Sequence, residues 1–391
     1  MTIMNTYNRS PLVFDKGEGS WLIEKSGDRY LDFVAGIAVN CLGHCHPAIA
    51  ETLSKQSRQL MHLSNLYWNS NQTALAKQLA DLSGLNQVFF CNSGTEANEA
   101  AIKLARKYGR RNGDEAKHII VHMKDSFHGR TMGSLSITGQ KKYQESFKPL
   151  MGGTREALFN DGASLSEVMT EAVCAVFIEP VQGESGVTPA TTEFLSLAKA
   201  LCEKYDALLI FDEVQCGMGR TGSLFAFERF GIKPDVVTLA KGLGGGFPIG
   251  AVLANNKAAS AFAPGDHGST FGGNPLACTV ALTVLSQLTE HGIIDAVSDK
   301  NAYVLERLAR IREKTPLIVD IRGMGLILGI QFASGAKEII ARCLAKRLLL
   351  ISAGNEVIRL VPALTISLEE LKIGLDILEE AILEIKNSIL T

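Results

Sequence analysis

Short apolar segments rich in β-branched residues recur through the middle of the chain, and longer segments with helical periodicity separate them. This alternation is typical of stacked βαβ units. Runs that are apolar throughout fit strands buried on both faces of a mostly parallel sheet. The pattern therefore predicts an α/β fold, with strands at residues 88–91, 118–122, 175–179, 208–212, 236–239 and 250–253.

The two ends of the chain have a different pattern. Residues 21–24 and 29–33 predict a hairpin, and a long helix is expected over residues 274–291. Strand-like segments at 318–322, 326–332 and 357–360 alternate with helical ones. We therefore expect a large α/β domain (residues 51–275) and a smaller α+β domain built from residues 1–50 and 276–391.

Composition excludes several classes of protein. The 391-residue chain has a net charge of −2, which gives no reason to expect a nucleic-acid or membrane partner. No apolar run approaches the roughly 20 residues of a membrane helix. Eight cysteines without paired spacing suit reduced thiols and a cytoplasmic location. The cluster at residues 41–46 lacks a second ligand pair at suitable spacing, so no metal is expected.

Polar residues follow several of the predicted strands. Lys241 stands between a strand and the glycine-rich residues 242–246, where a lysine can act as an amine nucleophile or grip a phosphate. Asp212 ends another strand and needs a cationic partner, either a protonated ring nitrogen or Arg220. The turn at residues 92–95 begins a helix and suits a phosphate. A phosphate turn, a buried carboxylate and a nucleophilic lysine together match the requirements of pyridoxal phosphate.

One glycine-rich segment resembles a nucleotide-binding motif. Residues 217–222 match the GxGxxG pattern literally, but a dinucleotide site needs a strand directly before it and a helix directly after it. We therefore expect a glycine-rich turn there.

Seven segments resemble one family in its order along the chain. They are NSGTEANEAAIKLAR (92–106), FHGRT (127–131), EPVQGE (179–184), LLIFDEVQCGMGRTG (208–222), LAKGLGGGFPIGA (239–251), HGSTFGGNPLAC (267–278) and RGMG (322–325). On these segments the chain resembles the class III aminotransferases of fold type I, which depend on pyridoxal phosphate. The resemblance runs from residue 30 to beyond residue 360 and is greatest to the members that act on acetylornithine.

The resemblance assigns cofactor roles. It implies that Lys241 binds the cofactor covalently and moves the proton, and that Asp212 pairs with the ring nitrogen. Phe127 would stack on the ring, and Thr270 would bind the phosphate of the neighbouring subunit's cofactor, which requires a homodimer. The full set of cofactor-binding residues that it implies is Gly94, Thr95, Phe127, Asp212, Glu213, Val214, Gln215, Lys241 and Thr270.

The resemblance also assigns substrate roles. Arg130 would bind one substrate carboxylate, although a surface salt bridge is the alternative for this residue alone. Arg359 would pair with Glu184 until glutamate displaces Glu184, and Ser269 would contact the acylated substrate. Ser185 stands where the family usually has glycine, which bears on substrate fidelity.

These roles imply a small-molecule reaction of arginine biosynthesis. The δ-amino group of N2-acetyl-L-ornithine would pass to 2-oxoglutarate, giving N-acetyl-L-glutamate 5-semialdehyde and L-glutamate. The apolar residues 36–39 favour an acylated amine over a free ammonium group. The alternative donors are succinylornithine, succinyldiaminopimelate, ornithine and 4-aminobutyrate. An aminomutase and a non-catalytic protein that binds pyridoxal phosphate are further alternatives.

Overall fold

The computed structural model describes the backbone of residues 2–390 and the side chains of residues 2–386. A seven-stranded sheet lies at its centre. In spatial order the strands are β4 (Gln87–Cys91), β12 (Gly250–Ala254), β11 (Val236–Leu239), β10 (Leu208–Asp212), β7 (Val173–Ile178), β5 (Ile119–Met123) and β6 (Thr154–Ala157). β12 runs antiparallel to both of its neighbours, and the other adjacent pairs are parallel.

The mostly parallel sheet confirms the predicted fold class, and each predicted central strand is present within two residues of its expected ends. Prediction missed β6. Its sequence, Thr-Arg-Glu-Ala, is polar, and the strand lies at the edge of the sheet where only its last residue is buried. An edge strand does not need the continuous apolar run that identifies a central one.

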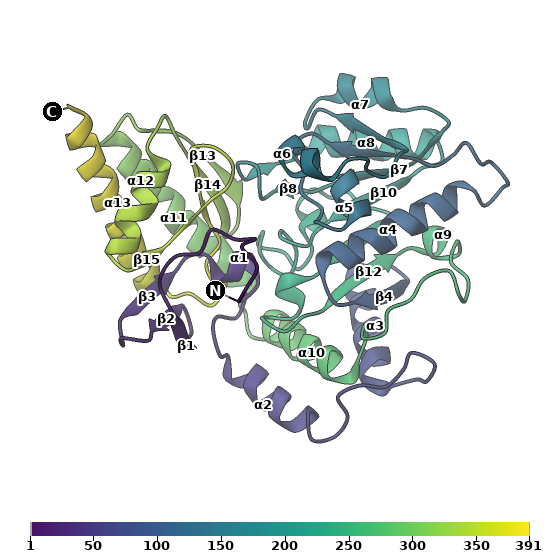
Figure 1. The fold of residues 1–391 in the computed structure, drawn as a ribbon, viewed down its shortest axis with the longest axis horizontal. Coiled ribbons are helices and arrows are strands. Elements are labelled where there is room, and N and C mark those ends of the chain that lie inside the picture. Colours follow the sequence, from purple (N-terminus) through teal and green to yellow (C-terminus); the bar gives the residue numbers. More distant parts are fainter. Residues whose placement is uncertain (1, 391) are drawn as a thin grey trace.

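Helices cover the central sheet (Figure 1). The helix α4 (Gly94–Gly109) packs against β12, β11 and β7, and α8 (Thr192–Lys204) packs against β10. The buried face of α4 carries Ala97, Ala101 and Leu104 at helical spacing. The other helical segments of this region are α3 (Ser70–Ser83), α5 (Met132–Ser136), α6 (Lys141–Gln144), η1 (Glu145–Phe147), α7 (Gly162–Val168), η2 (Ala226–Arg229), η3 (Lys241–Leu243) and α9 (Asn256–Ala259).

The two ends of the chain form two further four-stranded sheets. The predicted hairpin is present as β2 (Trp21–Glu24) and β3 (Arg29–Asp32), and these strands form one sheet with β1 (Phe14–Glu18) and β15 (Leu348–Leu349). A second sheet has the order β13 (Ile318–Met324), β14 (Ile327–Phe332), β17 (Val357–Leu360) and β16 (Ile351–Ser352). A two-stranded sheet joins β8 (Val181–Gln182) to β9 (Thr188–Pro189). The predicted two-domain division stays a prediction.

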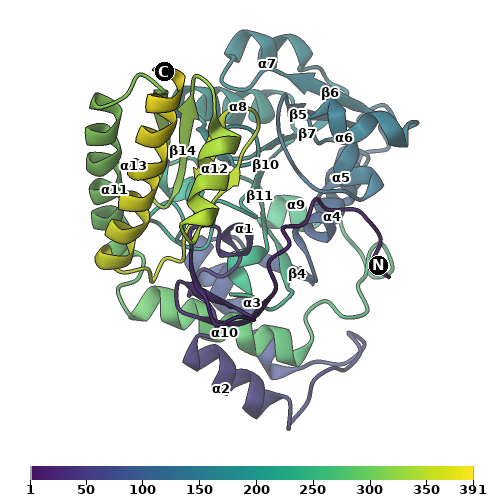
Figure 2. The same cartoon turned by 60° about the vertical axis from the view of Figure 1, so that its left-hand side comes forward.

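Long helices flank these end sheets. α11 (Asp295–Glu313), α12 (Ala336–Ala345) and α13 (Leu368–Leu390) lie together on the outer side of β14 (Figure 2). The predicted helix near residue 274 is α10 (Pro275–Glu290), which packs against α2 (Pro47–Gln56) and α3. The short α1 (Ala35–Ala38) follows β3. Within residues 2–390, none of the helices has the length and apolar character that crossing a membrane requires.

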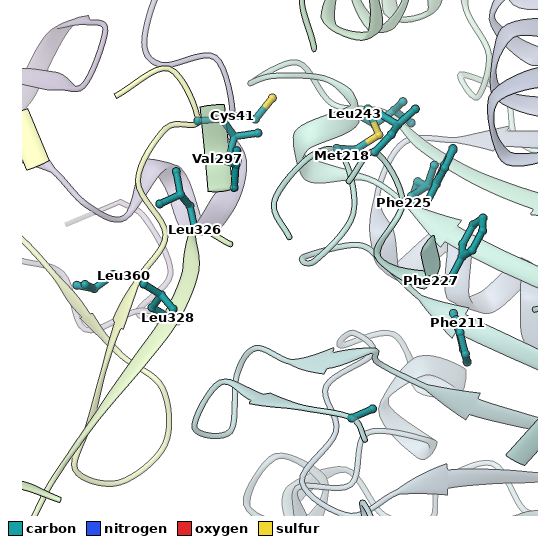
Figure 3. Packing of buried hydrophobic residues seen from close by; sticks show 14 of the residues in the cluster. Cys41, Phe211, Met218, Phe225, Phe227, Leu243, Val297, Leu326, Leu328 and Leu360 are labelled. Carbon is teal, nitrogen blue, oxygen red and sulfur yellow. The ribbon is translucent and has the colours of Figure 1, made fainter. Parts of the chain in front are cut away.

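One apolar core connects the central sheet with the C-terminal elements. Figure 3 shows members of this buried cluster from both regions, among them Phe211 on β10 and Leu360 on β17. Continuous packing of this kind fixes the relative positions of β10 and β17. Polar side chains near the ends of those strands are therefore held at defined separations.

Candidate active site

A cavity of about 410 Å³ opens where β4, β10 and β11 end. In an open α/β sheet, ligands bind beyond the carboxyl ends of the strands, and small-molecule pockets typically measure roughly 300–1,000 Å³. Its lining includes the predicted residues Gly94, Thr95, Phe127, Arg130, Asp212, Val214, Gln215 and Lys241. Folding thus brings together residues from four separate sequence motifs.

Lys241 follows β11 directly and lines the cavity. Its φ of +45° is a left-handed conformation that side chains rarely adopt, and such strain is often found at functional sites. Burial lowers the pKa of the Lys241 amine and Arg359 acts in the same direction, whereas Glu184 and Asp212 oppose the shift. A lowered pKa makes the neutral, nucleophilic form of the amine more available.

Asp212 is the last residue of β10 and is buried. Its Oδ2 accepts hydrogen bonds from Asn98 Nδ2 and His128 Nδ1, each at 2.7 Å, and its Oδ1 accepts one from the Val214 amide at 3.0 Å. The alternative partner Arg220 is wrong, because its guanidinium donates to the carbonyl oxygens of Leu326 and Pro362. The carboxylate is therefore held in place in the cavity lining, and within residues 2–386 no lysine or arginine nitrogen lies within 4 Å of it.

Three buried polar residues beside the cavity were not assigned roles from the sequence: Asn98, His128 and Glu179. Glu179 Oε2 accepts a hydrogen bond from the Phe127 amide at 2.9 Å and so holds the loop that carries the aromatic ring. Burial raises the pKa of Glu179 well above its ordinary value, and Asp212 adds to the shift. For Asn98 the sequence offered one signal, because it is a polar residue on the otherwise apolar buried face of α4.

The turn before α4 has the geometry of an anion site. Ser93 caps the helix, and its Oγ accepts from the Glu96 amide at 3.3 Å. Because the first amides of a helix have no intrahelical acceptor, those of Gly94 and Thr95 face outward for another partner. A Cβ on Gly94 would lie 2.6 Å from Cγ1 of Val214, so a residue larger than glycine does not fit here.

Arg130 lies at the exposed side of the cavity. Its Cζ stacks 3.7 Å from the centre of the Tyr143 ring and 5.5 Å from that of Phe127. The alternative of a surface salt bridge is wrong, since residues 2–386 offer this guanidinium no carboxylate within 4 Å. The charge is therefore positioned by aromatic rings and free to bind an anion.

Arg359 and Glu184 form a cluster next to Gln215. Arg359 is fully buried on β17, and its Nη1 donates to Glu184 Oε1 at 2.7 Å and to Gln215 Oε1 at 2.9 Å. Gln215 Nε2 donates to the same Glu184 oxygen at 2.9 Å. Burial alone would raise the pKa of Glu184, but Arg359, Lys241 and the Gln215 hydrogen bond together outweigh burial and lower it. Glu184 is thus an ionised partner of Arg359.

Besides Glu184 and Arg359, three predicted residues lie outside the cavity lining. Glu213 points away, and its carboxylate accepts hydrogen bonds from the amides of Ala226 and Phe227 at 2.6 and 2.8 Å. Ser269 Oγ accepts from Asn92 Nδ2 at 3.3 Å and so lies beside the cavity, not in it. Thr270 is exposed.

The donor set fits pyridoxal phosphate. The cavity offers an amine of lowered pKa for an aldehyde, an anchored carboxylate for a ring nitrogen, and outward amides at a helix start for a phosphate. Phe127 lines the same cavity and can cover a flat ring. Each chemical feature of the cofactor therefore has a matching group.

Comparison with known proteins agrees with this geometry. The family model described as "Aminotransferase class-III" matches residues 2–382. An acetylornithine aminotransferase of Clostridium acetobutylicum is 53% identical over 97% of this chain and 98% of its own. A succinylornithine transaminase of Yersinia pseudotuberculosis is 47% identical over 95% and 92%.

A solved structure extends the comparison to the fold. The Toxoplasma gondii ornithine aminotransferase, described with partial occupancy of PLP at its active site, has a TM-score of 0.95 at 30% identity. The match covers 100% of this chain and 94% of that one. The chain belongs to the class-III aminotransferases, enzymes that depend on pyridoxal phosphate.

Proposed function

We propose that the enzyme transfers the δ-amino group of N2-acetyl-L-ornithine to 2-oxoglutarate in arginine biosynthesis. The observation that carries this proposal is the ion pair between Arg359 Nη1 and Glu184 Oε1, at 2.7 Å. Both residues are near enough to Lys241 to influence the pKa of its amine. A buried arginine covered by a carboxylate presents a neutral surface to one substrate and a cation to another, once the carboxylate moves. Two donors of different charge can thus use one site.

Substrate binding then follows from the two arginines. Arg130 binds a carboxylate common to both donors, since no carboxylate of residues 2–386 lies within 4 Å of its guanidinium, which stacks on Tyr143. Acetylornithine reacts while Glu184 covers Arg359. Glutamate carries a second carboxylate, which displaces Glu184 and takes Arg359 as its partner.

Pyridoxal phosphate, when bound, supplies an aldehyde for the donor amine and a ring that takes up electrons. Lys241 Nζ lines the cavity and would accept and return the proton of the reacting substrate carbon, a role that its lowered pKa favours. Asp212, held by His128 and Asn98, stabilises positive charge on the ring nitrogen. Glu179 holds the loop of Phe127, whose side chain would cover the ring.

The preference for an acylated donor is supported by the apolar wall. Of residues 36–39, Val39 lines the cavity, and Phe247, Pro248 and Ile249 add further apolar lining. Such a wall leaves a free ammonium group without a partner, whereas an acetylated amine carries no charge. Succinylornithine is the second candidate, because a relative at 47% identity is named a succinylornithine transaminase.

A half-reaction screen tests the proposal. The enzyme loaded with cofactor is mixed separately with acetylornithine, succinylornithine, ornithine and 4-aminobutyrate, and the cofactor absorbance is followed. Acetylornithine should convert the cofactor fastest. Faster conversion by succinylornithine would identify the second candidate, and faster conversion by ornithine would refute the acyl preference.

We also propose a cytoplasmic homodimer with shared active sites. Exposed apolar side chains gather beside residues 269–272, where Asn65 Nδ2 donates to the carbonyl oxygens of Ser269 and Gly272. Trp68 is 90% exposed and Phe271 61%. Apolar surface of this kind marks an interface with another protein. Burying it against a second copy would carry Thr270 towards the partner's phosphate.

Mixed dimers test the sharing of sites. A Lys241→Ala chain and a Thr270→Ala chain are each defective alone. Their mixture should regain part of the activity, because one site in each mixed dimer contains both intact residues. A monomer by light scattering, or no regain on mixing, would refute shared sites.

A further inference from the structure

The loop between β8 and β9, residues 183–187, lies between the central sheet and the C-terminal sheet. On the C-terminal side, Arg359 Nη1 donates to the Gly183 carbonyl and Arg322 Nε to the Gly186 carbonyl, both at 2.7 Å. On the opposite side, Ser185 Oγ donates to the Asp125 carbonyl at 2.5 Å. Ser185 is thus bonded to the Asp125 segment, whereas the preceding residue, Glu184, is bonded to Arg359 on the C-terminal sheet.

The acceptor of the Ser185 bond is well anchored. Asp125 has a φ of +64°, and its amide donates to the Gly139 carbonyl at 2.9 Å. Gln182 Nε2 adds a second link from the hairpin, to the Lys124 carbonyl at 2.9 Å. Because the segment continues directly into Phe127 and Arg130, the loop that carries Glu184 is held against the loop that carries the substrate-binding arginine.

Arg359 has hydrogen-bonding capacity that its present partners do not use. Nη1 serves three acceptors, whereas Nε and Nη2 are buried and have no partner among residues 2–386. Buried donors without partners are costly, so the guanidinium favours a second acceptor whenever one can reach it. Glu184 occupies Nη1 as long as its loop keeps its position.

We propose that Ser185 is a positioning residue that holds Glu184 over Arg359, and that it thereby sets how readily the site admits a dicarboxylate. The inference rests on the proposed function, in which glutamate must displace Glu184. The Ser185 hydroxyl stabilises the covered arrangement by one hydrogen bond. A ligand that binds only the uncovered arrangement has its apparent affinity reduced by the small population of that arrangement.

The size of the effect follows from one hydrogen bond. Loss of an ordinary hydrogen bond changes an equilibrium by about fivefold. Ser185→Ala should therefore raise the uncovered population, and with it the affinity for a dicarboxylate, by about this factor. Glu184→Gln removes the charge that covers Arg359 and should tighten dicarboxylate binding as well. If Ser185 acts through Glu184, the two effects are not additive.

The test measures glutarate binding to the holoenzyme by calorimetry, which needs no turnover. The variants are Ser185→Ala, Ser185→Gly, Glu184→Gln and the Glu184→Gln/Ser185→Ala double variant. Ser166→Ala is the matched control, because Ser166 Oγ makes a comparable exposed bond to the Gly162 carbonyl in α7. Half-reactions with glutamate and acetylornithine provide a second readout.

Both Ser185 variants should bind glutarate about fivefold tighter than the wild type, with Ser166→Ala unchanged. In the Glu184→Gln background, Ser185→Ala should have no further effect. The half-reaction preference for glutamate over acetylornithine should rise by the same factor. A change below twofold, the same factor in both backgrounds, or no glutarate binding by any variant would overturn the proposal. Tighter glutarate binding without any reaction of acetylornithine would refute the proposed donor and leave the role of Ser185 standing.

Discussion

Replacing Asp212 with asparagine separates its charge from its shape. Asn98 Nδ2 and His128 Nδ1 both donate to Oδ2, and the Val214 amide donates to Oδ1. The asparagine carbonyl oxygen can accept from Asn98 and His128, but its amide group then faces the Val214 N–H. The substitution thus removes the hydrogen bond from the Val214 amide, which costs about 1 kcal/mol, together with the negative charge.

For cofactor binding and turnover, the loss of the negative charge should matter more than the loss of the Val214 hydrogen bond. A hydrogen bond to a charged group contributes roughly 1.5–3 kcal/mol, so cofactor affinity should fall by about 10- to 150-fold. Turnover depends further on the positive charge that Asp212 stabilises on the ring. Removing one preorganised electrostatic contact to a developing charge typically lowers kcat by roughly 10²- to 10³-fold, and we expect a loss of this size.

Asp235→Asn is the matched control. Asp235 is also buried, and it accepts hydrogen bonds from the Leu209 amide at 2.9 Å and from Asn255 Nδ2 at 2.7 Å, but at the opposite end of the same strands. Cofactor binding is titrated by absorbance, stability is measured by urea unfolding, and half-reaction rates are recorded. Both variants should lose about 1 kcal/mol of stability. The reasoning would be refuted if the Asp212→Asn variant bound the cofactor with a Kd within threefold of the wild-type value and kept half of the wild-type kcat.

Three further predictions follow from single residues. Gly94→Ala should destabilise the protein by about 1–3 kcal/mol in urea unfolding and weaken cofactor binding, because its Cβ would lie 2.6 Å from the Val214 side chain; unchanged stability would contradict this close approach. Arg130→Ala should raise KM for both acetylornithine and 2-oxoglutarate, and a rise for one alone would contradict shared use. Burial lowers the pKa of His122 to about 4, with His128 adding to the shift, so the unfolded chain binds more protons between pH 6.5 and 4. Stability should therefore fall by up to about 3 kcal/mol as pH drops through that window, and His122→Leu should flatten the profile in unfolding measured at several pH values.

Several elements could be predicted because their signals are local. β10 and β11 are continuous apolar runs that end at Asp212 and just before Lys241, and the structure has both strands at the predicted residues. Parallel strands place their carboxyl ends at one edge, so a shared site for these two residues follows from the strand pattern. The polar edge strand β6 had no such signal.

Partners chosen by packing could not be predicted. Arg220 was a reasonable cation for Asp212 in sequence, yet it lies against Leu326 and Pro362. Asn98 and His128, which do hold Asp212, lie 114 and 84 residues away from it. Glu179, which follows β7, likewise supports Phe127 from a distant part of the chain.

The sequence by itself determined the α/β class and the polar residues that follow the central strands. It also determined that a lysine, an aspartate and a helix start together match the requirements of pyridoxal phosphate. These depend on periodicity and on residue type, which are properties of short segments. The tertiary structure decided which groups meet: Arg359 reaches Glu184 across 175 residues, and Ser185 ties the same loop to Asp125. Hydrogen bonds act only within about 3 Å, so such partners are set by how the sheets pack on one core.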